Sequence, residues 1–142
     1  MTQIDFYTHV DDKWRTACRL VTKAHARGLR VAVLCPDADT AQRFDRMLWT
    51  SPSTGFIPHC PSTHALAART PVTISHENGE PPHDEVLLNL REYWPPMFSR
   101  FQRLIEIVST DDTDRASARD RFKFYRDRGY EIRSHDLSQT AS

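Results

Sequence analysis

Cysteine and histidine are the residues of this chain best suited to nucleophilic or metal chemistry. Cys35 ends the apolar run VAVLC (31–35), where catalytic groups of α/β proteins often lie, so it is a candidate nucleophile if a histidine approaches it. The alternative, which we favour, is a buried cysteine that serves as a small apolar side chain. His59, Cys60 and His64 could ligate a metal, but HCPSTH lacks the paired spacing of zinc sites, and we expect no metal there.

The distribution of glycine argues against a nucleotide site. The chain has four glycines, at positions 28, 55, 79 and 129, and no two of them are close in sequence. Closely spaced glycines are what allow a backbone to cradle a pyrophosphate. The acidic pairs 11–12 and 111–112 precede predicted helices, where they favour the helix dipole without any catalytic role. We therefore expect no cofactor and no catalytic site.

A basic and aromatic segment near the C-terminus, residues 114–133, is the strongest functional feature. On a helical wheel four cations share an arc of about 80°, with Phe122 beside them: Arg115, Arg119, Lys123 and Arg126. Such a face suits an acidic peptide that ends in an apolar residue, because guanidinium groups pair with carboxylates and an aromatic ring covers the apolar end. A solvated helix face with Phe122 in the core, or a stacking groove for single-stranded nucleic acid, are the alternatives.

A second feature is a group of large apolar residues around a predicted helix end and the loop after it. The group comprises Met47, Leu48, Trp49, Phe56, Ile57 and Pro58. If these side chains form one exposed patch, it would suit a protein partner, because monomers rarely leave such patches uncovered. Alternatively, Trp49 and Phe56 cover the core.

Alternating strand and helix patterns must position these residues. We expect strands at 4–10, 29–36, 71–75, 85–91, 104–109 and 130–137, helices at 11–28, 37–49 and 110–128, a short helix within 92–103, and mostly loop or short edge structure at 50–71. Ala118 and Tyr125 should anchor the last helix to the sheet, with Phe124 pointing the other way. The order predicts a single-domain, Rossmann-like α/β fold with a mostly parallel sheet and helices on both faces.

Length and charge narrow the class of protein further. The 142 residues fit one domain, 1–142, whose last residues from about 135 are expected to fray. The balance of 19 cationic against 19 anionic residues argues against wrapping long nucleic acid. No apolar run approaches the roughly 20 residues of a membrane span, and no signal-peptide pattern is present. With three unpaired cysteines, these features predict a cytoplasmic protein.

Several segments in combination resemble a known family. They are IDFY (4–7), VAVLCPD (31–37) followed by AQRFDRMLW (41–49), FIPH (56–59) and ARDRFKFYRDRGY (118–130). Over nearly its whole length the chain resembles the chi subunit family of the bacterial DNA polymerase III holoenzyme. The resemblance implies a Rossmann-like sheet without nucleotide chemistry, in a non-catalytic accessory subunit of the clamp-loader assembly.

The resemblance also implies two partners within the replisome, with DNA contacted only indirectly. One is the acidic C-terminal tail of single-stranded DNA-binding protein, and the residues implied for it are Arg119, Phe122 and Lys123, with Arg115 and Val108 at the edge. The other is the psi subunit of the clamp loader, for which Trp49, Phe56 and Pro58 are implied. Phe122 stands where the family has tyrosine, so the aromatic wall remains without its hydroxyl.

Overall fold

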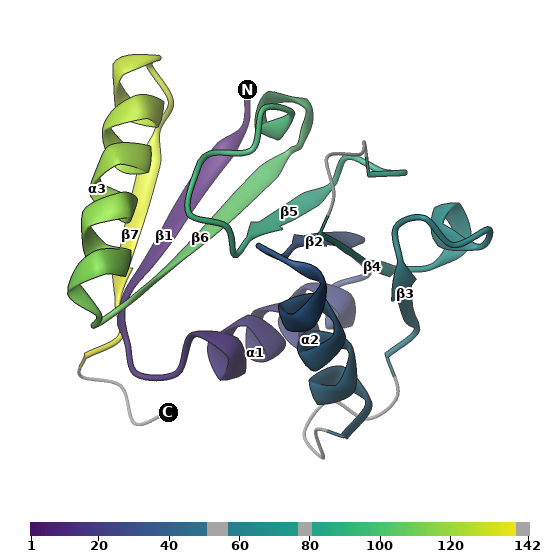
Figure 1. Cartoon of the computed structure of the whole chain (residues 1–142). Coiled ribbons are helices and arrows are strands. Elements are labelled where there is room, and N and C mark those ends of the chain that lie inside the picture. The colour runs from purple at the N-terminus through teal and green to yellow at the C-terminus, as the bar shows by residue number, and fades with distance from the viewer. Residues whose placement is uncertain (51–56, 77–80, 139–142) are drawn as a thin grey trace.

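A parallel β-sheet forms the centre of the molecule. The computed structural model describes residues 1–50, 57–76 and 81–138, and Figure 1 shows the arrangement of their elements. The strands are β1 (Gln3–Val10), β2 (Val31–Leu34), β3 (His59–Pro61), β4 (Val72–Ser75), β5 (Val86–Asn89), β6 (Arg103–Ser109) and β7 (Ile132–Asp136). In the described chain these seven strands lie in the order β3-β4-β2-β5-β6-β1-β7, and every neighbouring pair is parallel. The predicted mostly parallel sheet is therefore confirmed.

Helices cover both faces of the sheet, as predicted. They are α1 (Lys13–Ala26), α2 (Ala38–Thr50) and α3 (Asp112–Asp127), with single 3₁₀ turns η1 (Ala67–Arg69) and η2 (Phe98–Arg100). The helices α1 and α2 lie on one side of the sheet, and α3 lies on the other (Figure 1). The short helix predicted within 92–103 is only the 3₁₀ turn η2. No helix in the described ranges is long and apolar enough to cross a membrane.

The helix ends follow from local sequence. Asp12 accepts a hydrogen bond from the Arg15 N–H at 3.1 Å, and Asp111 accepts one from the Asp114 N–H at 3.0 Å, so both act as N-caps. Asp12, Asp111 and Asp112 thus lie at helix starts, as the sequence suggested. Gly129 follows α3 with φ of 84°, a left-handed conformation that glycine adopts without a steric penalty.

The apolar core consists of two layers, one on each face of the sheet. Under α1 and α2, Val21 and Phe44 belong to the same buried apolar cluster as Ile105 of the sheet. On the other face, Phe6 and Tyr125 belong to the layer beneath α3. Because both faces are covered, β2 is buried along its whole length, which explains its continuous apolar sequence.

The chain leaves the neighbouring strands β1 and β6 in opposite directions. After β1 it passes through α1 to β2 on one side, whereas after β6 it passes through α3 to β7 on the other. Right-handed crossovers then place α1 and α3 on opposite faces of the sheet. Such a reversal opens a crevice at the carboxyl ends of the two strands, where ligands of open α/β sheets commonly bind.

The C-terminal strand extends into the segment that was expected to fray. His135 and Asp136 belong to β7, which pairs with β1. His135 Nε2 lies 2.9 Å from the Asp5 carboxylate, and the Leu137 N–H donates to the Thr8 carbonyl at 3.0 Å. The ordered chain therefore continues past residue 135.

Candidate peptide-binding site

A groove of about 250 Å³ lies at the crevice between β1 and β6, under the first half of α3. Its walls come from β1 (Phe6, Thr8 and His9), β6 (Val108 and Ser109) and α3 (Arg115, Ala118, Arg119 and Phe122). Four of the five residues implied for acidic-tail binding line it together: Val108, Arg115, Arg119 and Phe122. Lys123 is exposed on α3 beside Phe122 but is not part of the groove wall.

The floor of the groove is apolar. Phe122 is half-buried, and its ring meets the Phe6 ring edge to face at 5.3 Å. Val108 and Ala118 are buried beside it. Phe122 therefore combines the two interpretations left open by the sequence, because it contacts the core and also forms part of the groove wall.

Cationic groups at the groove are largely uncompensated. Arg119 and Lys123 make no ion pair or side-chain hydrogen bond with any other described residue. Arg115 is half-exposed, and its one ion pair with a described residue is a contact of 3.9 Å with the fully exposed carboxylate of Asp112, which neutralises little of its charge. Positive charge thus remains available beside an apolar surface, which is the combination that an acidic peptide with an apolar end requires.

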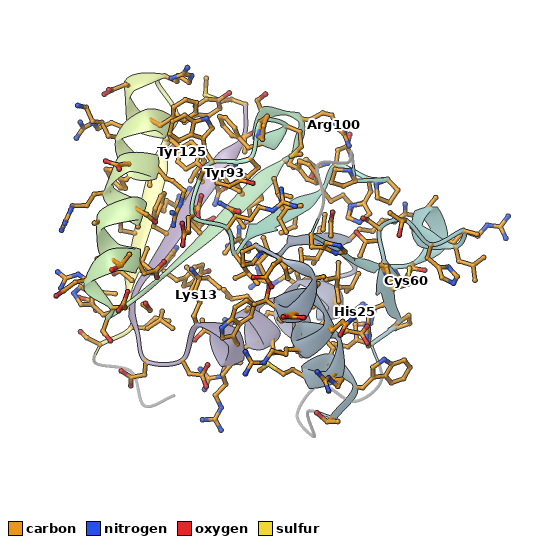
Figure 2. The ribbon with its side chains drawn as sticks, in the orientation of Figure 1. Lys13, His25, Cys60, Tyr93, Arg100 and Tyr125 are labelled. Carbon is orange, nitrogen blue, oxygen red and sulfur yellow. The ribbon has the colours of Figure 1, made fainter. Side chains whose placement is uncertain are left out.

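Asp114, an acidic residue in the first turn of α3, is engaged within the fold. Its carboxylate accepts hydrogen bonds from the Ser109 N–H at 2.8 Å and hydroxyl at 2.9 Å, and pairs with Lys13 Nζ at 3.1 Å. Burial would raise the pKa of Asp114, but these bonds and the Lys13 charge hold it below its usual value. Figure 2 shows Lys13 between the start of α1 and the lower end of α3. This carboxylate therefore opposes the groove's positive charge less than the sequence suggests.

A buried polar network sets the orientation of α3. Arg121 is 1% exposed and pairs with the fully buried Glu106 of β6 at 3.1 Å, while the Tyr125 hydroxyl donates to Glu106 at 2.6 Å. Asn89 also donates to Glu106, at 3.0 Å. Burial raises the pKa of Glu106, although Arg121 in particular favours its charged form. Because Arg121 points inward, Arg119 and Lys123 must point outward.

Sequence reasoning missed this network and part of the groove. Arg121 was given no role in the sequence analysis, although it follows Ala118 by three residues and precedes Tyr125 by four, on the buried stripe of the helix. The sequence signal that could have revealed its partner was Glu106, an acidic residue in the middle of the apolar strand β6. His9 was also missed: it has φ of 58° at a register irregularity between β1 and β6, and it forms one end of the groove.

The second predicted surface is partly described. The Trp49 side chain is exposed at 56%, and its ring lies 4.8 Å from the ring of His59. Pro58 is half-buried nearby in sequence, and Phe56 lies outside the described residues. His59 Nδ1 donates to the Ile57 carbonyl at 2.7 Å, and Nε2 lies 3.2 Å from the Asp45 carboxylate. His59 is therefore held beneath the exposed indole.

The candidate catalytic and metal residues do not assemble into a site. Cys35 is fully buried, and burial raises the pKa of its thiol to about 12, so it stays protonated. His59 is bound as above, and His64 Nδ1 accepts from the Leu66 N–H at 3.0 Å. No three histidine, cysteine or acidic side chains in the described part of the chain come together as metal ligands.

Comparison with known proteins decides the family. A family model described as DNA polymerase III chi subunit, HolC, matches residues 1–133. The chain belongs to this family. It is 36% identical to the DNA polymerase III subunit chi of Pseudomonas aeruginosa, with 96% of this chain and 98% of that relative covered. Identity to the subunit chi of Escherichia coli is 27%, with 81% and 79% covered, and to that of Haemophilus influenzae 28%, with 85% of each covered.

Family membership establishes the general role of the chain. Chi is a non-catalytic accessory subunit of DNA polymerase III, so this chain acts in DNA replication as part of the replisome. The buried, protonated Cys35 fits a protein without a thiol mechanism. The groove under α3 is then the candidate surface for a partner within the replisome.

Proposed function

We propose that this chi-family subunit binds the acidic C-terminal tail of single-stranded DNA-binding protein in the groove under α3. The observation that carries the proposal is the position of Arg119 and Lys123, which have no ion-pair partner among the described residues and flank the half-buried Phe122. Carboxylates of the tail pair with these cations, and its apolar end contacts Phe122 and Val108. Arg115 adds charge at the edge of the site.

Binding of this kind is rapid and sensitive to salt. Charges at a solvent-exposed rim increase the association rate and are screened over about 8 Å at physiological ionic strength. A single contact is weak, but many tails on one coated strand raise the effective concentration of ligand. The subunit would thereby hold the polymerase near single-stranded template.

The second half of the proposal is a link to the clamp loader through the psi subunit. Trp49 supports it, because a tryptophan side chain exposed at 56% is unusual on a surface with no partner and is typical of interface centres. Pro58 and Phe56 complete the proposed psi-facing patch, Phe56 from outside the described residues. The two partners would then occupy different elements, α3 and the end of α2.

Titration calorimetry with a peptide of the tail tests the first half. We expect Arg119→Ala and Lys123→Ala each to weaken binding by about 1–3 kcal/mol, the range for a hydrogen bond to a charged group. Arg43→Ala, which removes an exposed cation from α2, should leave the affinity unchanged. Unchanged affinity in both α3 variants would contradict the site.

Two further ligands sharpen this titration. A peptide with an amidated C-terminus tests whether the terminal carboxylate is recognised, and we expect it to bind more weakly. A single-stranded oligonucleotide without any partner protein tests the nucleic-acid alternative. Tight binding of the oligonucleotide, with no binding of the peptide, would assign the groove to nucleic acid instead.

A further inference from the structure

A second hollow, of about 280 Å³, lies on the other side of His9 from the groove under α3. It is formed by the end of β1, the start of α1 and the chain after β7. The residues that matter for its charge are His9, Asp11, Asp12, Arg15 and Arg19. His9 belongs to both hollows, so they meet at this side chain.

The first turns of α1 and α3 are joined directly. Lys13 Nζ lies 3.1 Å from Asp114 Oδ1, and both side chains are mostly buried. This ion pair neutralises its own two charges and holds the helix starts together. The cationic side chains that follow on each helix therefore lie on adjoining surfaces: Arg15 and Arg19 on α1, Arg115 and Arg119 on α3.

Arg15 and Arg19 are exposed and one helical turn apart. Neither side chain makes an ion pair or hydrogen bond within the described ranges. Of the acids in this hollow, Asp12 is occupied as the cap of α1, through the Arg15 backbone N–H. Asp136, at the end of β7, is engaged by His9 at 3.2 Å, so Asp11 is the exposed acid of the hollow that has no ion pair or hydrogen bond with other described residues.

We propose that the binding site for an acidic peptide continues past His9 onto Arg15 and Arg19. This inference rests on the proposed function, because it assumes that the apolar end of the peptide lies at Phe122. Carboxylates next to that end would pair with Arg119 and Arg115. An extended chain covers about 3.3 Å per residue, so a few further acidic residues upstream reach the α1 pair. The extended site would therefore bind long acidic tails more tightly than short ones.

Peptide length and α1 charge can be varied together to test this. One peptide carries two acidic residues before an apolar C-terminal residue. A longer peptide adds four acidic residues upstream, and a third replaces those four with serine. Each is titrated into wild type, Arg15→Gln/Arg19→Gln, and the control Lys23→Gln/Arg27→Gln. The control removes the same charge at the same spacing near the far end of α1.

We expect the short peptide to bind all three proteins equally. The acidic extension should tighten binding to wild type and to the control by roughly fivefold, the effect of about two exposed ion pairs, and the serine extension should not. Arg15→Gln/Arg19→Gln should lose this gain. An equal gain in all three proteins would overturn the extension alone. Failure of the short peptide to bind, or its indifference to Arg119→Ala, would overturn the proposed function and the extension with it.

Discussion

Arg121 of α3 donates from Nε to the Glu106 carboxylate of β6 at 3.1 Å, with both side chains excluded from solvent. A buried charge pair needs additional hydrogen bonds to offset the cost of desolvation. Here Glu106 also accepts from Tyr125 and Asn89, and Arg121 donates to the Ser117 hydroxyl at 2.7 Å. The pair therefore fixes the rotation of α3, and with it the direction of the groove's cations.

Replacing one partner of this ion pair should reduce the free energy of unfolding more than replacing both partners. Arg121→Met leaves Glu106 buried without its cation, and we expect a loss of about 3–5 kcal/mol in the free energy of unfolding. Glu106→Gln/Arg121→Met removes both charges while keeping an acceptor for the Tyr125 hydroxyl, so it should be the more stable of the two variants. Urea denaturation measures both. Arg119→Met, an exposed cation on the same helix, should unfold like wild type, and a single variant as stable as the double would refute the argument.

Asp5 should make stability depend on pH at the acidic end. Burial would raise its pKa, but hydrogen bonds from His135 at 2.9 Å and Arg103 at 2.8 Å hold the pKa below the ordinary 3.8. Asp5 therefore binds a proton more readily in the unfolded chain than in the folded one. The stability that its carboxylate contributes is complete above the ordinary pKa and is lost as pH falls through the lowered pKa of the folded state.

The variant Asp5→Asn isolates this contribution. We expect it to reduce the free energy of unfolding by about 1–3 kcal/mol near pH 6, because the bonds to His135 and Arg103 lose a charged acceptor. The difference from wild type should shrink below about pH 4. Denaturation curves at several pH values provide the measurement, and a difference that stays constant down to pH 2 would show that Asp5 does not titrate as inferred.

Substitutions of Phe122 should raise or lower the affinity for an acidic peptide, depending on the side chain introduced. Phe122→Tyr adds a hydroxyl at the groove wall, and we expect acidic-peptide affinity to rise by about 0.5–1.5 kcal/mol through one new hydrogen bond. Phe122→Ala removes the aromatic wall and should weaken binding. Calorimetry with the tail peptide measures both variants. If both bind as wild type does, the peptide does not contact this ring.

Trp49 should contribute to binding of the psi subunit. We expect Trp49→Ala to weaken binding of the psi subunit by at least about 2 kcal/mol, as for other tryptophans at interface centres. Leu66→Ala is a matched control, because Leu66 is also 56% exposed but lies on another segment. Calorimetry with psi from the same organism is the measurement. Equal effects of the two substitutions would remove Trp49 from the interface.

The fold was largely predictable because its elements have strong local signals. The apolar run of β2, the capping acids Asp12 and Asp111 and the terminating Gly129 each specify a strand or a helix end without distant contacts. The prolines at 95 and 96 misled the prediction of a helix in 92–103, because only a 3₁₀ turn follows them. Strand order depends on crossovers and was not predicted.

The groove was predictable along α3 but not across the sheet. Spacing on a helical wheel places Arg115, Arg119 and Phe122 on one face regardless of tertiary structure. That β1 would contribute Phe6 and His9 depends on β1 lying beside β6, two strands far apart in sequence. Arg121 was given no role, because charge alone does not show which arginine pairs with a buried acid.

The two outer strands of the sheet also limit how copies of this chain meet one another. The short strand β3 ends in Pro61, which has no backbone N–H. A strand from another copy therefore cannot form a complete set of backbone hydrogen bonds at that edge. At the opposite edge β7 carries the charged, exposed Arg133. Crowding of such subunits around a replication fork therefore does not favour edge-to-edge pairing of their sheets into fibres.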